Sequence, residues 1–307
     1  MSIQDWTAAD MPDLTGKTVI VTGGNNGLGY NAVKAFAEKG ARVIMACRSL
    51  SKGELAKKQI FDHHPKSNIT VMELDLENLK SIHNFADNFR KTFAQLDILV
   101  NNAGIMMVPY GLTKDGFEKQ MGTNHLGHFA LTGLLLDLLK STPHSRVVNV
   151  SSMAHKQGVM DYDNLLFDGG KDYSPIKAYG RSKLANLLFT YELQRFFEAN
   201  KIDCMALAAH PGVSDTNLFD HAAPKWVMKT LRPLFLLMIQ PAAMGALPEL
   251  RAATDPKARG GEYYGPDGKR EMKGFPVIVQ PNQSALNVES AQKLWEASEK
   301  LTSIKYA

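Results

Sequence analysis

Tyr179 and Lys183 are four residues apart in a segment with helical periodicity, so their side chains share one face of a helix. A phenol titrates near pH 10, about three units too high for ready proton exchange at neutral pH. A nearby ammonium favours the phenolate, and the spacing therefore predicts a tyrosine with a lowered pKa that can give and take a proton. An exposed Tyr–Lys pair with no chemical role has the same spacing, so other motifs must decide.

A glycine-rich turn follows the apolar run at 18–21. In the stretch VTGGNNGLG, Gly23, Gly27 and Gly29 precede a helical pattern. Glycine there costs backbone entropy, but it lets the backbone approach a ligand more closely than a Cβ would permit. The N–H groups and partial positive charge of a helix N-terminus bind phosphate. The turn therefore predicts a pyrophosphate site, with a tight structural turn as the alternative.

The elements that must position these residues follow from the hydrophobic pattern. Short apolar runs alternate with longer helical patterns: strands at 18–22, 42–46, 70–74, 96–100, 146–150 and 203–209, and helices at 28–39, 51–62, 78–93, 113–140 and 178–199. The runs are continuously apolar, which is typical of strands covered on both faces. The alternation predicts a doubly wound parallel sheet in a three-layer α/β/α (Rossmann) fold.

After residue 212 prolines divide the pattern into shorter pieces. We expect helices at 225–240, 242–253 and 289–301 and a short strand at 263–264. Ligands bind beyond the carboxyl ends of the strands in such folds. The sequence thus predicts one domain, with a cofactor-binding and catalytic core over 15–215 and a substrate lid and C-terminal extension over 216–307.

Composition excludes several classes of protein. The 307 residues are 44% hydrophobic and carry a net charge of +4, with basic and acidic residues interleaved, so a nucleic-acid-binding arm is not expected. Cys47 and Cys204 fall in apolar strands and are expected to be buried free thiols in a reducing compartment. The N-terminus lacks a signal-peptide pattern, and the apolar stretch 234–239 is too short for a membrane span. We expect a soluble cytoplasmic protein.

Together, these motifs resemble the short-chain dehydrogenase/reductase family. Its dinucleotide motif is similar to Thr22-Gly23-x-x-x-Gly27-x-Gly29, and its other motifs match residues in order over about 15–215: Asn101-Asn102-Ala103-Gly104, Asn124, Ser151-Ser152, Tyr179-x-x-x-Lys183 and Pro211-Gly212. The segments MACRSLSKG, GGEYYGPDG and LWEASEKLT look like the retinol-dehydrogenase-like branch, which extends the resemblance to nearly the whole chain.

The resemblance implies a catalytic role for four residues: Asn124, Ser152, Tyr179 and Lys183. Tyr179 would exchange a proton with a carbonyl or alcohol oxygen, which Ser152 rather than Ser151 would also hydrogen-bond. Lys183 would bond the nicotinamide ribose, and Asn124 would hold a water that relays protons, unless it is an ordinary helix amide. Ser152 and Tyr179 are 27 residues apart, about twice the usual separation in the family, and this insert is expected to line the substrate pocket.

The resemblance also implies a set of cofactor-binding residues. They are Gly23, Asn25, Asn26, Gly27, Leu28, Gly29, Arg48, Lys52, Asp75, Leu76, Asn102, Ala103, Gly104, Tyr179, Lys183, Pro211, Gly212, Val213 and Thr216. Asp75 has an alternative role as a helix N-cap. An acidic residue at the end of the second strand would accept bonds from the ribose 2′-hydroxyl and repel a 2′-phosphate. Cys47-Arg48 stands there instead, with Lys52 one turn on, and a guanidinium pairs with phosphate, so NADP(H) is favoured.

Weaker patterns leave alternatives open. His125-x-x-His128 has a helical spacing that could hold a metal, but without an evident third ligand we expect hydrogen-bonding histidines and no metal. Met106, Met107 and Met153 either line a pocket for a bulky apolar ligand or fill the core. His155 either touches substrate or is structural. The 225–240 segment is a lid, a dimer surface or a membrane contact.

The sequence therefore predicts an NADP(H)-dependent oxidoreductase that interconverts a carbonyl and an alcohol on a lipophilic small molecule. The resemblance implies pro-S hydride transfer and leaves a homo-oligomer open. An NADP-sensing regulatory protein without turnover is the alternative from another class, although it would not need all four catalytic residues. A nucleotide-sugar epimerase shares the fold, but its glycine spacing and larger C-terminal domain do not fit.

Overall fold

A central sheet of eight strands forms the middle layer of this computed structural model, which describes residues 5–214 and 240–307. The strand order is β3-β2-β1-β4-β5-β6-β7-β8, and every neighbouring pair is parallel except β7–β8. The strands are β1 Thr18–Thr22, β2 Arg42–Cys47, β3 Asn68–Glu73, β4 Ile98–Asn101, β5 Ser145–Val150, β6 Cys204–Ala209, β7 Tyr263–Pro266 and β8 Pro276–Ile278. The order reverses between β1 and β4, which places a crevice at their carboxyl ends.

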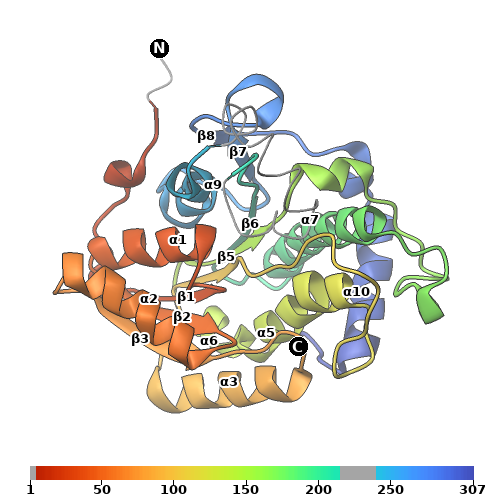
Figure 1. Cartoon of the computed structure of the whole chain (residues 1–307), viewed down its shortest axis with the longest axis horizontal. Coiled ribbons are helices and arrows are strands. Elements are labelled where there is room, and N and C mark those ends of the chain that lie inside the picture. Colours follow the sequence, from red (N-terminus) through yellow and green to blue (C-terminus); the bar gives the residue numbers. More distant parts are fainter. Residues whose placement is uncertain (1–4, 215–239) are drawn as a thin grey trace, which may run out of the picture.

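Helices cover both faces of the sheet (Figure 1). The main helices are α1 Gly27–Glu38, α2 Leu50–His63, α3 Leu79–Thr92, α4 Lys119–Met121, α5 Gly127–Leu134, α6 Leu136–Ser141, α7 Pro175–Ala199, α9 Ala242–Thr254 and α10 Val288–Thr302. One apolar core joins the sheet to α1, α2 and α9, and a second joins it to α3, α5 and α7. The predicted three-layer α/β/α fold is confirmed.

The long helix predicted over 113–140 is interrupted. Its first residues form a turn, and α4 begins where the buried Glu118 carboxylate accepts hydrogen bonds from the N–H groups of Gln120 and Met121. The π-helical turn η2 (Gly122–Leu126) then leads into α5, and α6 follows after Leu135. Periodicity alone could not show this, because the same side-chain pattern serves an α-helix and a π-turn.

The C-terminal part adds to the sheet. β7 pairs with β6, and α9 packs against α1, so residues from 240 onward contribute to the main cores. β8 was not predicted, because it has three residues and begins with a proline, which leaves little periodicity to detect. The predicted helix at 225–240 lies almost wholly outside the described residues, and the division into a core and a lid stays a prediction.

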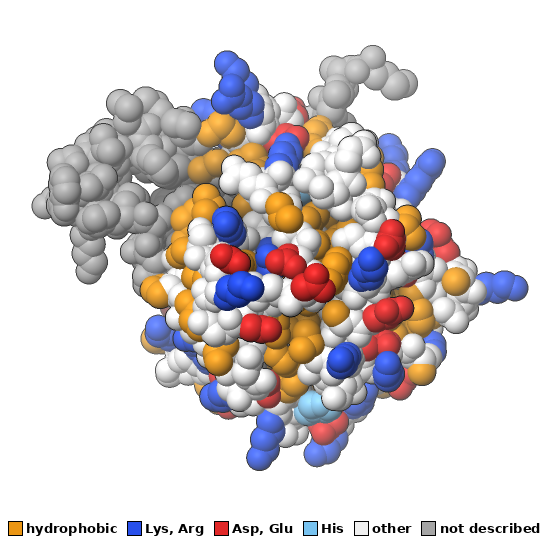
Figure 2. Space-filling model, turned by 90° about the vertical axis from the view of Figure 1, so that its right-hand side faces the viewer, with side chains coloured by type: hydrophobic (Ala, Val, Ile, Leu, Met, Phe, Trp, Pro, Cys, Tyr) orange, Lys and Arg blue, Asp and Glu red, His pale blue; other side chains and the backbone are white. Residues whose placement is uncertain are grey.

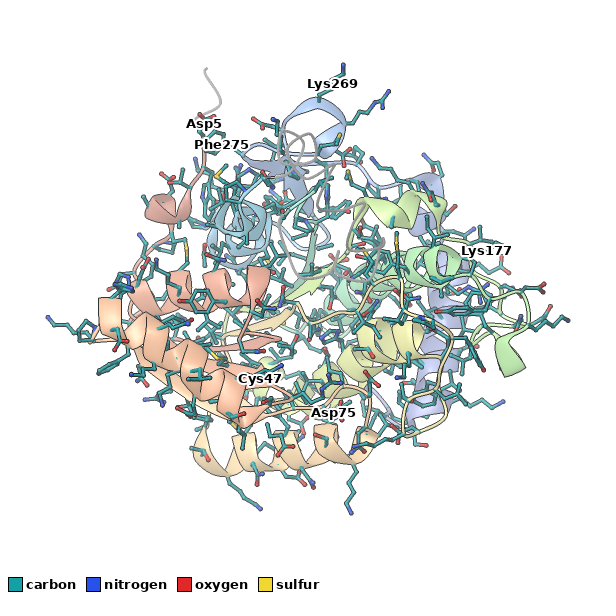
Figure 3. The ribbon with its side chains drawn as sticks, in the orientation of Figure 1. Asp5, Cys47, Asp75, Lys177, Lys269 and Phe275 are labelled. Atoms are coloured by element: carbon teal, nitrogen blue, oxygen red, sulfur yellow. The ribbon has the colours of Figure 1, made fainter. Side chains whose placement is uncertain are left out.

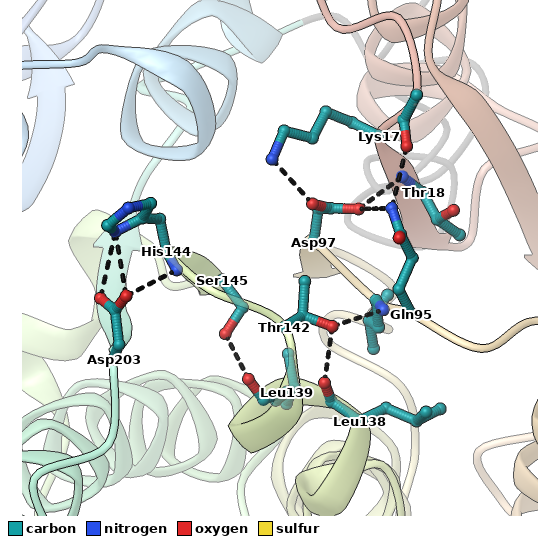
Figure 4. Close-up of polar contacts among 12 residues, drawn as sticks. Lys17, Thr18, Gln95, Asp97, Leu138, Leu139, Thr142, His144, Ser145 and Asp203 are labelled. Carbon is teal, nitrogen blue, oxygen red and sulfur yellow. Dashed lines mark hydrogen bonds and ion pairs between the residues drawn. The ribbon is translucent and has the colours of Figure 1, made fainter.

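Polar contacts tie the amino-terminal edge of the sheet together (Figure 4). Asp97, just before β4, accepts a hydrogen bond from the N–H of Thr18 at 2.8 Å and pairs with Lys17 at 2.9 Å. Asp203, just before β6, accepts from the N–H of His144 at 3.1 Å. These bonds join the starts of β1 and β4 and the starts of β5 and β6, and so help to fix the register of the strands whose carboxyl ends form the opposite edge.

The charged side chains and the cysteines lie where the composition led us to expect them. On the face in Figure 2, basic and acidic side chains are intermixed. Cys47 and Cys204 are buried free thiols, as predicted. Across residues 5–214 and 240–307, no helix has the length and apolarity that crossing a bilayer requires.

Candidate active site

A cleft of about 640 Å³ opens at the carboxyl ends of β1, β4, β5 and β6. Its lining brings together most of the predicted site residues: Gly23, Asn25, Asn26, Gly27, Leu28, Gly29, Arg48, Asn102, Ala103, Gly104, Ser152, Tyr179, Lys183, Pro211, Gly212 and Val213. Six segments far apart in the sequence therefore meet at the crevice that the strand order predicts.

The glycine-rich turn runs from β1 into α1. Gly23 has φ +66°, in the left-handed region that favours glycine. A Cβ at Gly29 would lie 2.5 Å from the Gly23 carbonyl oxygen, so only glycine fits there. Asn26 caps α1, since its side chain accepts a hydrogen bond from the Gly27 N–H at 2.8 Å. The turn thus presents backbone at a helix N-terminus, a geometry suited to phosphate.

Thr22 locks this turn to the loop after β4, a role that the sequence analysis missed. Its hydroxyl oxygen accepts hydrogen bonds from the N–H groups of Asn102 at 3.0 Å and Ala103 at 2.9 Å. The Asn102 amide donates to the Thr22 carbonyl at 2.7 Å. A threonine directly before the first glycine was the available signal, because its hydroxyl lies at the end of β1 beside the end of β4.

The two serines after β5 have different surroundings. The Ser151 hydroxyl is buried and donates to the Lys183 carbonyl at 2.8 Å, so it fastens α7 to β5. Ser152 is partly exposed in the cleft and hydrogen-bonds the Tyr179 hydroxyl. The long insert therefore does not separate Ser152 from Tyr179, because η3 (Met153–Gln157) and the loop after it fold back to α7.

Arg181 holds that insert against α7. Its guanidinium donates to the carbonyls of Val159 at 3.0 Å, Asn164 at 2.6 Å and Leu165 at 3.0 Å. It also lies 4.0 Å from the centre of the Phe167 ring, within cation–π range. Arg181 is two residues after Tyr179, so the same helix positions the phenol and anchors the insert.

The expected lowering of the Tyr179 pKa is wrong for this structure. Burial raises the pKa of Tyr179 to about 12, and the hydrogen bond with Ser152 only partly opposes this. Burial also lowers the pKa of Lys183 to about 8. The Lys183 ammonium donates to the Val150 carbonyl at 3.0 Å and lies 5.7 Å from the centre of the Tyr179 ring. Desolvation thus controls the titration of both groups, and the phenol is protonated at neutral pH.

Asn124 is fully buried in η2, beside the cleft. Its amide oxygen accepts from the Ile105 N–H at 2.9 Å, and its amide nitrogen donates to the Ile105 carbonyl at 3.0 Å and to Ser182 Oγ at 2.9 Å. The side chain therefore ties η2 to the loop after β4 and to α7. The water relay expected of Asn124 stays a prediction.

Cys47 ends β2, and Asp75 follows the neighbouring strand β3 (Figure 3). Arg48, predicted to select the cofactor, comes directly after Cys47. The Arg48 side chain is 71% exposed, borders the cleft and lies 3.5 Å from Glu77. Asp75 and Leu76 line an adjoining hollow of about 180 Å³ together with Arg48. Asp75 is not the α3 N-cap, which is Asn78. Lys52 is exposed on the first turn of α2 and is not among the cleft-lining residues described, and Thr216 lies outside the described residues.

Similarity to known proteins agrees with this geometry. A sequence model of the short chain dehydrogenase family matches residues 17–164. Human retinol dehydrogenase 11 is 44% identical over 289 residues, covering 93% of this chain and 85% of its own, and human retinol dehydrogenase 13 is 39% identical over 297 residues, covering 95% and 86%. The chain belongs to the short-chain dehydrogenase/reductase family. Within that family it falls in the retinol-dehydrogenase-like branch, as predicted.

Solved structures share the fold. A crystal structure of an uncharacterized protein from Mycobacterium Paratuberculosis is 42% identical, with a TM-score of 0.83 and 99% of each chain covered. The Pseudomonas aeruginosa RhlG/NADP active-site complex is 21% identical, with a TM-score of 0.64, and covers 82% of this chain and 94% of its own. The second likeness supports the fold alone.

Membership in the short-chain dehydrogenase/reductase family makes this protein an oxidoreductase that interconverts carbonyl and alcohol groups of a small molecule with a nicotinamide cofactor. The residues present fit such a dinucleotide. The glycine turn leaves no room for a Cβ at Gly29 and presents the α1 N-terminus to the cleft, where a pyrophosphate would bind.

The weaker patterns resolve as follows. His128 Nε2 lies 2.9 Å from Thr22 Oγ1, and His125 Nε2 lies 2.9 Å from Ser298 Oγ, so both histidines make hydrogen bonds. The described part of the chain contains no group of three residues that could hold a metal ion. His155 is buried and bonds the Ser152 carbonyl at 2.6 Å, which is the structural alternative.

Met106, Met107 and Met153 line the cleft, together with Ile176 and Gln157, which the sequence analysis missed. Ile176 is three residues before Tyr179 on the same helix face, and that spacing was the available signal.

Proposed function

We propose that this protein is an NADP(H)-dependent oxidoreductase that interconverts a lipophilic aldehyde or ketone and its alcohol, with Tyr179 as the acid and base. One observation carries the proposal: Tyr179, Ser152 and Lys183 face the same cleft as the glycine-rich turn. When bound, the nicotinamide supplies or accepts the hydride. The protein's own residues bind the dinucleotide, orient the substrate and move the proton.

The proton chemistry follows from the burial of the site. Because the pKa of Tyr179 is about 12, its phenol holds a proton at neutral pH and can donate it to a carbonyl oxygen. The Ser152 hydroxyl, bonded to Tyr179, is placed to donate to the same oxygen and stabilise its developing charge. In alcohol oxidation the phenol must first lose its proton, which the nearby Lys183 ammonium favours. The resting state therefore suits carbonyl reduction.

Arg48 supports a preference for NADP(H). It borders the cleft at the end of β2, where an acidic residue would instead favour NAD(H). The Glu77 carboxylate lies 3.5 Å from the Arg48 guanidinium. A 2′-phosphate bound there would compete with Glu77 for this guanidinium.

A lipophilic substrate is supported by the apolar residues of the cleft. Met106, Met107, Met153 and Ile176 line it with apolar side chains that adapt to bulky ligands. The named relatives are retinol dehydrogenases, and we infer a substrate of retinoid, steroid or quinone size. The cytoplasmic location, the homo-oligomer and the lid stay predictions.

The test is oxidation of NADPH, and in parallel NADH, with carbonyls ranging from small aldehydes to retinal and steroid ketones. Turnover of a bulky apolar carbonyl with NADPH is the expected result. Tyr179→Phe should lower kcat by about 10²- to 10⁴-fold, the usual contribution of a general acid, while NADPH binding persists. Tyr191→Phe is the matched control, because Tyr191 lies on the same helix and is not among the cleft-lining residues described.

Normal turnover by the Tyr179→Phe variant would refute the proposed mechanism. A preference for NADH would refute the inference from Arg48. Tight NADPH binding without turnover of any carbonyl would favour the sensor alternative.

A further inference from the structure

Glu271 contacts two segments that form walls of the cleft. It lies in the short 3₁₀ turn Lys269–Glu271, between β7 and β8. Its Oε1 accepts a hydrogen bond from Lys156 Nζ at 3.0 Å, and its Oε2 lies 3.0 Å from His210 Nε2. Lys156 belongs to η3, which begins directly after Ser152, and His210 directly precedes the 211–213 turn.

The His210 ring connects the carboxylate to that turn. The imidazole is fully buried, and its Nδ1 accepts a hydrogen bond from the Gly212 N–H at 3.2 Å. Since Nδ1 is the acceptor, Nε2 carries the proton; it lies 3.0 Å from Glu271 Oε2, a close contact whose angle is outside that of a hydrogen bond. The backbone adds a second tie, because the Val213 N–H donates to the Met272 carbonyl at 2.7 Å.

The charge on Glu271 is maintained by these neighbours. His210 chiefly, and then Lys156, lower the pKa of Glu271 to about 2 against the opposing effect of burial. The carboxylate is therefore ionised throughout the neutral range, and within the ion pair the Glu271 side chain is 24% exposed and the Lys156 side chain 43%.

We propose that Glu271 is a positioning residue: through Lys156 on one side and His210 on the other, it holds η3 and the 211–213 turn at a fixed separation across the cleft. This inference rests on the proposed function, which gives the two walls their tasks. The η3 side follows Ser152, which orients the substrate oxygen, and the 211–213 side contacts the dinucleotide.

The two contacts should therefore have separable effects. Loss of the Lys156 contact loosens the start of η3 beside Ser152, which should lower kcat and leave NADPH affinity unchanged. Loss of the Glu271 charge releases both walls, which should weaken NADPH binding and lower kcat together. If these residues only stabilised the fold, their substitution would lower the midpoint of thermal unfolding. The Lys156 variant would then not lower kcat while leaving NADPH affinity unchanged.

The experiment compares the full chain with Glu271→Gln, Lys156→Met and Lys269→Gln. Lys269 is the matched control, because it lies on the same turn and its side chain points away from the molecule (Figure 3). We measure the NADPH dissociation constant by the fluorescence of the reduced nicotinamide, kcat with the best carbonyl of the panel, and the unfolding midpoint. Glu271→Gln should raise the dissociation constant and lower kcat by about three- to tenfold each, in line with loss of a charged hydrogen bond.

Lys156→Met should lower kcat by about threefold or more without changing NADPH affinity, and Lys269→Gln should match the wild type. Wild-type values for both Glu271→Gln and Lys156→Met would overturn the proposal, as would equal losses in Lys269→Gln. If Glu271→Gln fails to fold, the kcat of Lys156→Met decides alone. Turnover by the wild-type protein tests the proposed function separately. If the wild type did not turn over, the NADPH affinity of the Glu271→Gln variant would still test the proposed role of Glu271.

Discussion

Glu249 should make the stability of the protein depend on pH. It lies on α9 with 2% of its surface exposed, and neither carboxylate oxygen has a hydrogen-bond partner among the described residues. Burial raises the pKa of Glu249 to about 8 from its ordinary 4.5. A carboxyl whose pKa is higher in the folded chain contributes stability below its unfolded value and loses it as pH rises toward the folded value.

The magnitude follows from the two pKa values. One pKa unit corresponds to about 1.4 kcal/mol, so keeping Glu249 protonated in the fold costs about 3 kcal/mol at pH 7 and about 1 kcal/mol at pH 5. Glu249→Gln keeps the shape and removes the titration. Its stability relative to wild type should therefore rise by about 2–3 kcal/mol between pH 5 and pH 7.

Urea unfolding of both proteins at the two pH values measures this difference, with free energies from linear extrapolation. All other titrating groups are common to the pair and cancel. Glu249→Met is the second variant, and it should be the more stable of the two at both pH values because it also removes the unpaired polar atoms. A difference between Glu249→Gln and wild type that does not change with pH would refute the argument from burial.

Two further predictions concern cofactor choice and the C-terminus. Arg48→Ala should raise KM for NADPH about five- to tenfold and leave KM for NADH unchanged, since an exposed ion pair contributes about 1 kcal/mol. Tyr306→Ala should destabilise the fold by about 3–5 kcal/mol, because this buried ring packs 4.5 Å from Trp295 and 4.8 Å from Phe129, centre to centre. Steady-state kinetics and urea unfolding, respectively, measure these effects.

Each of these has a control. Lys58→Ala removes an exposed charge farther along α2 and should leave both KM values near wild type, so an equal loss there would contradict a specific role for Arg48. Tyr306→Phe keeps the ring and removes only the hydroxyl that donates to the Phe129 carbonyl at 2.7 Å, so it should cost about 1 kcal/mol. Equal destabilisation by both Tyr306 variants would contradict the packing argument.

Local signals in the sequence were enough for the architecture, the glycine-rich turn and the Tyr179–Lys183 pair, whereas most other site residues were implied by the family resemblance. Continuously apolar strands indicated a sheet covered on both faces, and the glycine spacing placed a phosphate-binding turn where α1 begins. The four-residue spacing of Tyr179 and Lys183 put them on one helix face near the same cleft. These features depend on neighbours in the chain or on the regular repeat of a helix or strand, so the order of residues is sufficient to show them.

Tertiary structure alone decided the properties that depend on distant neighbours. The pKa of Tyr179 rises because other segments exclude water from it, although a lysine stands one turn away on the same helix. Ser152 and Tyr179 meet only because the insert folds back onto α7, and Glu271 reaches His210 from a turn that carries no motif. Burial and contacts across the sheet set these energies, and neither has a signature in the spacing of residues along the chain.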